Sequence, residues 1–484
     1  MSDEDQPQQP PPVASPASTE VNVKSPGPPK RLIFCFDGTW NTLDARCPTN
    51  VVLTAETVLP MAPDGKAQPI FYDEGVGTGR FERLAGGMFG WGLTDRLGDA
   101  YRFLTFNYTP GDEIFVFGFS RGAFTARSFV GMLRNCGIVS RSNAGRIKDA
   151  INWYRARSPS KGPGSLRSRR FRAEVSPAVC VEEGEDAWRQ ANVPGYAAGS
   201  APLLKVRFLG VWDTVGALGV PSRYRWLIVL NRKFQFHDTA LSAMVESGRH
   251  AVAIDERRKD FTPTLWSNLD ELNRDAGAEP ASPSAPYQEH WFPGVHCGVG
   301  GGGDFRGLSD QSLQWVWEGA QAAGLALDTS VGSRMYELSP DPFSPISPFD
   351  EDELSWWQRS KSAVMNDLWR RGDRIGVAEL AYVSNSARRR WKADPKSLPE
   401  GVLYRPAPLS CFAEELDALP SVPPPPPPGT FNIVRVGPDD TLSKIALRQL
   451  GDAKRAQEIF DLNRDALDDS DHIYCGMPLR VPKG

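Results

Sequence analysis

Three short runs of apolar, strand-forming residues stand out along the chain. They are Arg31 to Phe36, Glu113 to Phe119 and Lys205 to Trp212, and each is almost continuously hydrophobic and followed by glycine or aspartate. This pattern is typical of strands that are covered on both faces. Stretches of helical period lie between them, for example Gly122 to Leu133 and Thr239 to Ala253. Alternating strands and helices predict an α/β domain with a mainly parallel sheet and flanking helices.

Changes in composition divide the chain into four parts. Residues 1–30 contain much Gln, Pro, Ser and Glu and no aromatic residue, which predicts a disordered N-terminus. Residues 31–415 carry the strand and helix pattern of the large domain. The prolines within residues 416–429 are typical of a semi-rigid linker, after which residues 430–484 form a separate module. Inside the large domain, residues 158–201 are rich in Ser, Arg, Gly and Pro and predict an insertion or a long surface loop.

Composition and charge exclude several classes of protein. The net charge of −4 gives no electrostatic reason to expect a nucleic-acid partner. Seven cysteines without a CxxC pair favour neither a disulfide scaffold nor a zinc site, so we expect no metal, no cofactor and synthesis into the reducing cytoplasm. No apolar run approaches the roughly 20 residues of a membrane span. The N-terminus lacks the basic start and apolar core of a signal peptide, so export would need another route.

A candidate nucleophile follows the second apolar run. The pentapeptide Gly118-Phe119-Ser120-Arg121-Gly122 stands between a predicted strand and a predicted helix rich in small residues. A Gly-x-Ser-x-Gly sequence in this position is typical of a nucleophile elbow, in which the two glycines make room for a strained turn that raises the serine hydroxyl above the sheet. An ordinary tight turn is the alternative. The strand and helix on either side favour Ser120 as a nucleophile.

A serine nucleophile near neutral pH requires a histidine base, and the chain has five histidines. His237 and His250 lie in stretches of helical period, where a structural role is expected, and His472 lies in the tail. His290 and His296 flank a short apolar segment, and a glycine-rich run follows His296. A histidine at a strand end on such a loop can reach over the sheet edge, so His296 is the predicted base and His290 the alternative.

The carboxylate that orients the base is also expected after a strand. Asp213 follows the third apolar run directly. The chain order Ser120, Asp213, His296 is the order found in α/β-hydrolases and differs from that of chymotrypsin- and subtilisin-type enzymes. Asp255 is the competing candidate, but the adjacent Arg257 and Arg258 indicate a structural ion pair instead.

An oxyanion hole requires two backbone N–H groups that face the developing charge. The residue after the nucleophile, Arg121, is expected to supply one of them. The other should come from the loop after the first strand, where Gly38 or Thr39 would donate and Asp37 would hold the loop by hydrogen bonds. The Asp-Gly-Thr sequence of this loop is also found in haloacid-dehalogenase-type phosphatases, but the position of their nucleophilic aspartate is Cys35 here.

Taken together, these blocks resemble the catalytic domain of type VI secretion lipase effectors, over most of residues 31 to about 410. Six ordered segments carry the resemblance: Phe36 to Asn41, Tyr72 to Thr78, Gly118 to Ala123, Gly210 to Val215, His250 to Arg258 and Phe292 to His296. The resemblance implies an α/β-hydrolase-like fold, phospholipase activity of the A type on a lipid ester, and a triad of Ser120, Asp213 and His296. The chain departs from the family after the histidine, where it has Cys297-Gly298 instead of the usual Ser-Asp.

The tail from Phe431 to Pro482 resembles a lysin motif (LysM). Its pattern predicts a strand, a helix for which Thr441 is the candidate N-cap, a second helix and a closing strand. The resemblance implies binding to glycans that contain N-acetylglucosamine, such as peptidoglycan. The alternative is a docking tail for another protein, for example a component of a secretion apparatus.

Two hypotheses for function follow from the sequence. The first is a serine esterase or lipase, directed to cell-wall glycan by its LysM module and exported as an antibacterial effector. The second is a hydrolase scaffold that has lost catalysis and acts as a peptidoglycan-binding or adaptor protein. Labelling by a fluorophosphonate discriminates between them, because only a working triad activates the serine.

Overall fold

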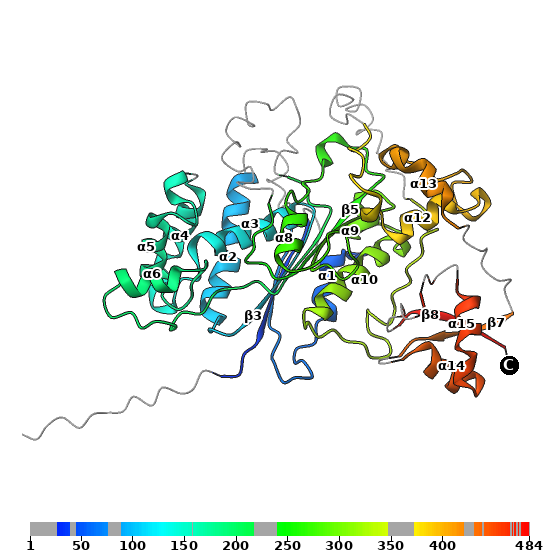
Figure 1. Ribbon diagram of the computed structural model, residues 1–484, viewed down its shortest axis with the longest axis horizontal. Helices are drawn as coiled ribbons and strands as arrows, with labels where there is room; N and C mark the ends of the chain where they lie inside the picture. Colours follow the sequence, from blue (N-terminus) through cyan, green and yellow to red (C-terminus); the bar gives the residue numbers. More distant parts are fainter. Residues whose placement is uncertain are drawn as a thin grey trace, which may run out of the picture.

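Six parallel strands form the centre of the large domain, in the order β2-β1-β3-β4-β5-β6 (Figure 1). The structure, a computed structural model, describes residues 27–38, 45–75, 89–156, 158–216, 240–346, 372–420, 430–437, 440–464, 467, 469, 470, 473 and 476–483. The predicted α/β class with a mainly parallel sheet is confirmed. Most of the expected disordered N-terminus, the proline run 421–429, His237 and His472 lie outside the described residues. Within the described part, no helix is long and apolar enough to cross a membrane.

Each central strand contributes side chains to two hydrophobic cores, which explains why the apolar runs in the sequence are almost continuous. Along β1, Leu32, Phe34 and Phe36 pack into one core, whereas Ile33 and Cys35 pack into the other. All five side chains are fully buried, because successive side chains of a strand point to opposite faces of the sheet. The strands are β1 (Arg31–Phe36), β2 (Ile70–Asp73), β3 (Glu113–Phe119), β4 (Phe208–Trp212), β5 (Gly248–Ala253) and β6 (Tyr287–Phe292).

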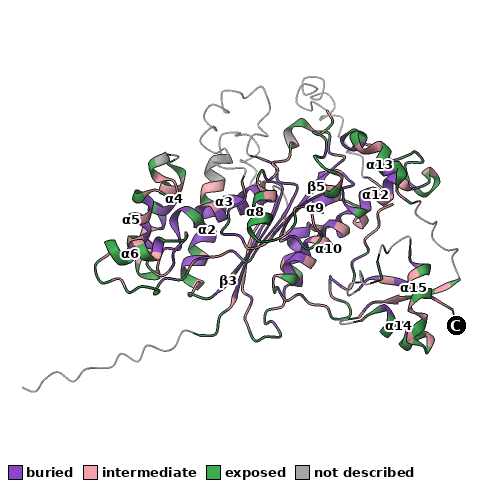
Figure 2. Ribbon diagram, viewed as in Figure 1, coloured by how far each residue is buried: buried purple, intermediate pink, exposed green. Residues whose placement is uncertain are grey.

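Helices cover both faces of this sheet, and buried residues concentrate between the layers (Figures 1 and 2). One face carries α2 (Phe89–Asn107), α3 (Arg121–Cys136), α4 (Ile147–Arg155), α5 (Leu166–Val175) and α6 (Glu185–Asn192). The other carries α1 (Asn50–Thr57), α9 (His296–Gly300) and α10 (Gly307–Ala322). A short helix, α8 (Leu269–Asp275), precedes β6.

The segment after residue 372 packs against the β5 and β6 side of the sheet. It contains α12 (Asn385–Lys392) and α13 (Ala413–Ala418). A third apolar core joins this segment, through Trp391 and Leu409, to Val252 and Trp291 of the sheet. This packing brings residues far along the chain close to the ends of β5 and β6.

The predicted helix over Thr239 to Ala253 is wrong. Within the described part of this stretch, residues 248–253 form β5, which pairs with β4 on one side and β6 on the other. A Cβ on Gly248 would lie 3.3 Å from the carbonyl oxygen of Leu209, so this position fits a close-packed strand. Pairing on both edges outweighs the weak helical period, and His250 is therefore a strand residue.

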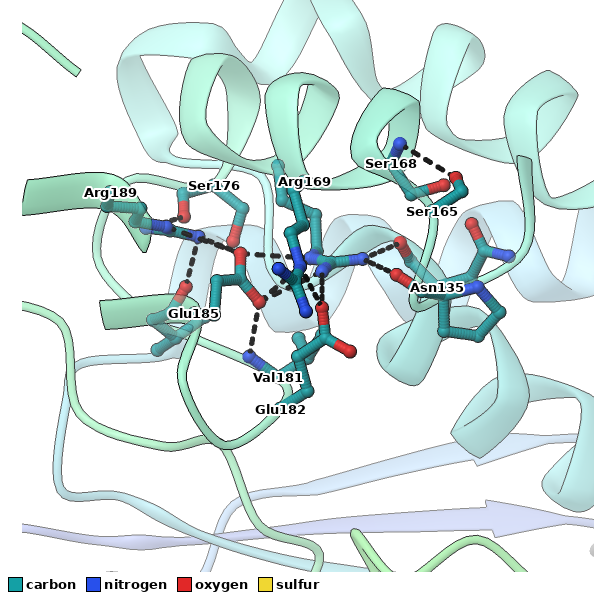
Figure 3. Close-up of polar contacts among 12 residues, drawn as sticks. Asn135, Ser165, Ser168, Arg169, Ser176, Val181, Glu182, Glu185 and Arg189 are labelled. Atoms are coloured by element: carbon teal, nitrogen blue, oxygen red, sulfur yellow. Dashed lines mark hydrogen bonds and ion pairs between the residues drawn. The ribbon is translucent and has the colours of Figure 1, made fainter. Parts of the chain in front are cut away.

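The segment 158–201 is not a long surface loop, because it contains α5 and α6. Figure 3 shows Glu185 between Arg189 and the backbone of Val181. Glu185 also accepts hydrogen bonds from Arg172, and the side chains of Arg172, Glu185 and Arg189 are at most 1% exposed. The composition of this segment does not reveal that a buried carboxylate pairs with two of its arginines. These buried ion pairs explain why a segment with the composition of a loop is an ordered part of the domain.

The C-terminal module has the predicted strand, helix, helix, strand order. Its elements are β7 (Phe431–Arg435), α14 (Leu442–Leu450), α15 (Ala456–Leu462) and β8 (Pro478–Pro482), and β7 pairs with β8 antiparallel. The Thr441 side chain caps α14 by accepting from the amide of Lys444, as expected. The module contacts the large domain where Arg435 donates to the carbonyl oxygens of Tyr336 and Leu338.

Candidate active site

The backbone turns sharply at Ser120, between β3 and α3. Ser120 has φ 58° and ψ −122°, a conformation that residues with a side chain rarely adopt. Its amide donates to the carbonyl oxygen of Trp212 at 3.0 Å, and its carbonyl accepts from the amide of Val215 at 3.3 Å. These bonds fasten the turn to the end of the neighbouring strand β4. Strain of this kind persists only where the surrounding structure holds it.

The two glycines of the pentapeptide are required by close packing. A Cβ on Gly122 would lie 2.1 Å from the carbonyl oxygen of Phe36, and one on Gly118 would lie 2.6 Å from the carbonyl oxygen of Gly122. Both distances involve backbone atoms that cannot move aside. Glycine at these two positions lets α3 begin directly against the ends of β1 and β3.

Asp213 follows β4 and is fully buried. It is another residue with a side chain and positive φ, at 39°, and among the described non-glycine residues only Ser120, Asp213 and Ala281 have positive φ. Its amide donates to the carbonyl oxygen of Ala251 at 2.7 Å, and its Oδ1 accepts from the amide of Ala253 at 3.0 Å. The neighbouring strand β5 therefore fixes both the backbone and the carboxylate of Asp213.

Two side chains converge on the Asp213 carboxylate. Nδ1 of His296 lies 2.5 Å from Oδ2, and the Arg374 guanidinium contacts both oxygens, with Nη1 2.6 Å from Oδ1 and Nη2 2.8 Å from Oδ2. Burial alone would raise the pKa of Asp213, but the charge and hydrogen bonds of Arg374, together with the bond to His296, hold this pKa well below its usual range. Asp213 is therefore an anion beside the histidine at neutral pH.

Arg374 is the site residue that sequence reasoning missed. Its side chain is 4% exposed, and it also donates to the carbonyl oxygens of Ala253 and Phe261, each at 2.7 Å. Because Arg374 lies 161 positions after Asp213 in the chain, no local pattern identifies their pairing.

His296 begins α9 and lies between two aromatic rings. The ring of Phe119 is 4.6 Å from the imidazole and that of Phe261 is 4.8 Å, measured between centroids. A Cβ on Gly300 would lie 1.9 Å from the Phe119 ring, so the glycine-rich sequence lets α9 approach the end of β3. Burial lowers the pKa of His296, while the bond and charge of Asp213 oppose this effect.

The structure thus gathers Ser120, Asp213 and His296 at the carboxyl ends of the parallel strands. His296 packs on Phe119, which directly precedes Ser120, and bonds to Asp213. Among the described residues, however, no hydrogen bond joins the Ser120 hydroxyl to the His296 ring. In an unliganded enzyme such bonds are often long and tighten only when substrate binds.

The competing residues, His290 and Asp255, have other partners. His290 stacks on Trp315 at 4.8 Å, and burial with the nearby charges of Arg249 and Arg388 lowers its pKa to about 4. Asp255 accepts from the Gly294 amide at 2.6 Å and from the Tyr404 hydroxyl at 2.9 Å, so the predicted ion pair with its neighbouring arginines is wrong.

A second histidine–carboxylate pair supports the Asp213 loop. Nε2 of buried His250 lies 3.2 Å from the amide of Thr214, the residue after Asp213, and Nδ1 lies 2.8 Å from Glu289. A backbone amide can only donate, so Nε2 accepts and the proton of the neutral ring is on Nδ1. His250 thus positions the backbone beside Asp213.

The predicted oxyanion donors are only partly described. Asp37 is buried and accepts from the Thr49 and Tyr72 hydroxyl groups, at 2.7 and 2.9 Å. The Gly38 amide donates to Asp37 Oδ1 at 2.6 Å, so this amide is already engaged within the loop. Thr39 lies outside the described residues. The Arg121 amide belongs to the first turn of α3, where amides have no acceptor within the helix.

Residues 30–319 match the family model described as "T6SS, Phospholipase effector Tle1-like, catalytic domain". The chain belongs to this family. Residues 434–482 match the LysM domain model. Arg374 therefore lies outside the matched part of the catalytic domain, although it contacts Asp213. Within the described residues, no cluster of three or more His, Cys, Asp or Glu side chains is arranged to hold a metal ion.

Individual relatives are distant. Uncharacterized protein YEL023C of Saccharomyces cerevisiae is 29% identical over 255 residues, which are 50% of this chain and 33% of that protein. An uncharacterized protein from Pseudomonas aeruginosa has a crystal structure that matches with a TM-score of 0.37 and 16% identity, over 91% of this chain and 60% of that one. The Tle1 effector bound to the VgrG spike of the Type 6 secretion system matches with a TM-score of 0.29 and 19% identity, over 56% of this chain and 52% of that one. This chain therefore spans a third of the yeast protein and half to three fifths of the two solved chains.

Proposed function

We propose that this protein is a serine esterase that cleaves lipid esters, as a phospholipase of A type. Ser120 is the nucleophile, His296 the base and Asp213 the residue that orients the base. The observation that carries the proposal is the strained Ser120 turn beside the buried His296–Asp213 pair at the carboxyl ends of the parallel strands. Membership of the phospholipase effector family supports a lipid ester as substrate.

The reaction needs only these groups and water. Ser120 Oγ attacks the ester carbonyl carbon while its proton passes to Nε2 of His296. The Arg121 amide, at the start of α3, stabilises the negative charge on the former carbonyl oxygen. The alcohol then leaves with the proton from Nε2, and the acyl group stays on Ser120. Water repeats these steps, releasing the fatty acid and restoring the serine.

Covalent labelling tests the proposal. We expect an alkyl fluorophosphonate probe to label wild-type protein at Ser120 and to leave the Ser120→Ala and His296→Ala variants unlabelled, because only an activated serine attacks the phosphorus. Peptide mass spectrometry identifies the labelled residue, and melting curves verify that the variants are folded. Labelling of Ser120→Ala to the wild-type extent would contradict the assignment.

The alternative is a scaffold without catalysis that serves as a glycan-binding or adaptor protein. Two observations favour it. The positive charge of Arg374 partly compensates the negative charge of Asp213, which weakens the support of Asp213 for a protonated His296. In addition, no hydrogen bond joins Ser120 to His296 in the part of the chain that the structure describes. The same labelling experiment decides, since this alternative predicts an unreactive but folded wild-type protein.

We further propose that the LysM module holds the enzyme at peptidoglycan, close to the lipid that it cleaves. The module match and its own buried core, which includes Ile445, Ile459 and Leu479, support an independent binding unit. The family description and the spike-bound relative support export by a type VI secretion system, with a protein of that apparatus as a second partner.

Deleting residues 430–484 is expected to leave turnover of a soluble ester within about two-fold of wild type, since the module contributes no predicted triad residue. The same deletion should abolish co-sedimentation with purified peptidoglycan and lower activity on intact envelopes, because tethering raises the local enzyme concentration. Arg435→Gln is the control, since it weakens the contact with Tyr336 but keeps the module. Equal sedimentation of full-length and truncated protein would contradict glycan anchoring and favour a docking role.

Arg374→Gln is expected to move the acid limb of the kcat/KM profile to higher pH. Without the guanidinium, the Asp213 charge acts on the imidazole alone, so the pKa of His296 rises and the base stays protonated to higher pH. Stopped assays on a soluble ester between pH 5 and 9 measure this shift. Arg257→Gln is the control, because Arg257 is exposed and pairs with Asp373. If kcat/KM of the Arg374→Gln variant falls by the same factor at every pH, Arg374 has only a structural role.

A further inference from the structure

A cavity of about 430 Å³ lies beside α3, apart from the predicted triad. Its wall includes Arg127 and Arg134 of α3, Trp153 of α4, Lys161 and Trp266. Arg127 follows Ser120 by two helical turns, which is about 10 Å along the helix axis. The volume is within the usual range for sites that bind small molecules, about 300–1,000 Å³.

The lining combines positive charge with apolar surface. Three cationic side chains, Arg127, Arg134 and Lys161, contribute to it, and no aspartate or glutamate occurs among the described lining residues. The Lys161 ammonium lies 4.6 Å from the centroid of the Trp153 ring and forms no ion pair within the part of the chain that the structure describes. Val130 and Leu209 also line the cavity but are almost fully buried, so its accessible apolar surface comes mainly from Trp153 and Tyr154. Such a lining favours a ligand with one anionic end and one apolar part.

A second observation comes from Trp266. This side chain is 6% exposed and lines the cavity, and its indole N–H has no hydrogen-bond partner in the described structure. The Trp266 backbone amide donates to Glu289 at 3.0 Å, which fixes the residue in place. A buried donor without an acceptor costs free energy, which a bound acceptor group would recover. This donor and the cationic side chains all favour an acceptor-rich, negatively charged ligand.

The cavity wall is held by the buried ion-pair cluster of α5 and α6. Arg172 donates to the carbonyl oxygens of Asn135, at 3.2 Å, and Pro163, at 2.8 Å. The Asn135 side chain in turn donates to the carbonyl of Lys161, at 3.0 Å. Figure 3 shows Asn135 beside this cluster. Because fully buried charges fix these backbone positions, the cavity exists before a ligand arrives.

We propose that this cavity binds an anionic amphiphile, a single alkyl chain with a carboxylate or phosphate head. The head contacts Lys161 and the Trp266 N–H, and the chain lies on the surface of Trp153 and Tyr154. This site is separate from the proposed ester-cleaving site and does not depend on it. A free fatty acid and a phosphate monoester share this chemistry, and binding measurements can distinguish them.

Calorimetric titration of the full chain with Ser120→Ala tests the proposal. The probes are decanoate, decyl phosphate and decyl maltoside, each below its critical micelle concentration, and inorganic phosphate. We expect at least one of the two anionic amphiphiles to bind with one-to-one stoichiometry, at least ten-fold more tightly than the neutral maltoside or phosphate alone. The tighter of the two identifies the head group. Equal binding of decyl maltoside, or no binding by either anion, would overturn the proposal.

Variants place the binding in this cavity. Lys161→Gln is expected to weaken binding of the anionic amphiphile about ten-fold. Trp266→Phe keeps an aromatic ring but removes the N–H donor, and it is expected to weaken binding about three- to ten-fold. Lys148→Gln is the matched control, because Lys148 is exposed on α4 and does not line the cavity. Equal affinities of the Lys161 and Lys148 variants would overturn the proposal. His296→Ala should abolish hydrolysis without changing this binding, so failure of the enzyme proposal and failure of the cavity proposal give different results.

Discussion

Replacing Ser120 by alanine is expected to lower kcat for ester hydrolysis by about 10⁴- to 10⁶-fold, and adding His296→Ala should make it hardly worse. In the proposed triad the serine and histidine act as one unit, because a base without a nucleophile has no proton to accept. The structure gives each a fixed position, Ser120 in a strained turn and His296 between Phe119 and Phe261. Residual activity should then come from other groups at the site.

A double-mutant cycle on kcat/KM with a soluble ester measures this coupling. Ser128→Ala and His290→Ala are the matched controls, because Ser128 lies two turns along α3 and His290 stacks on Trp315 away from Asp213. Both should keep activity within several-fold of wild type. Strictly additive losses for Ser120 and His296, or a large loss for His290→Ala, would mean that the base is wrongly assigned.

Local sequence pattern predicted the elbow well. A buried strand, two glycines around one serine and a small-residue helix are contiguous in the chain, and the packing that requires Gly118 and Gly122 is encoded in that short segment. Asp213 and His296 were predicted by the rule that chemistry collects at the carboxyl ends of parallel strands. The rule identifies strand ends, and the actual hydrogen bond joins residues 83 positions apart.

Long-range contacts explain what the sequence did not predict. Arg374 reaches Asp213 only because the third core packs its segment against β5 and β6. The residues before Ala253 form a strand despite their weak helical period, because β5 pairs with a strand on each side. Residues 158–201 have the composition of a loop, but Glu185 pairs with Arg172 and Arg189 in the interior. In each case a partner distant in sequence decides the structure.

Asp213→Asn is expected to lower kcat by a factor on the order of 10⁴, as the corresponding change does in serine proteases. An asparagine offers no charge to stabilise the imidazolium, and its amide N–H can hold His296 in the wrong tautomer. Asp255→Asn is the control. Burial raises the pKa of Asp255 to about 6, so the fold disfavours its charged form, and the side-chain oxygen of an asparagine can still accept from Gly294 and Tyr404. If Asp255→Asn loses activity and Asp213→Asn does not, the acid is wrongly assigned.

Stability must be separated from catalysis in this experiment, because Asp213→Asn leaves the buried Arg374 charge without its carboxylate. Breaking a buried ion pair in this way costs about 3–5 kcal/mol. The double variant Asp213→Asn with Arg374→Met removes both charges, so we expect it to regain much of the lost melting temperature. Its activity should stay as low as that of Asp213→Asn alone, since the histidine still lacks its anion. Recovery of activity together with stability would show that Asp213 acts through the fold and not on His296.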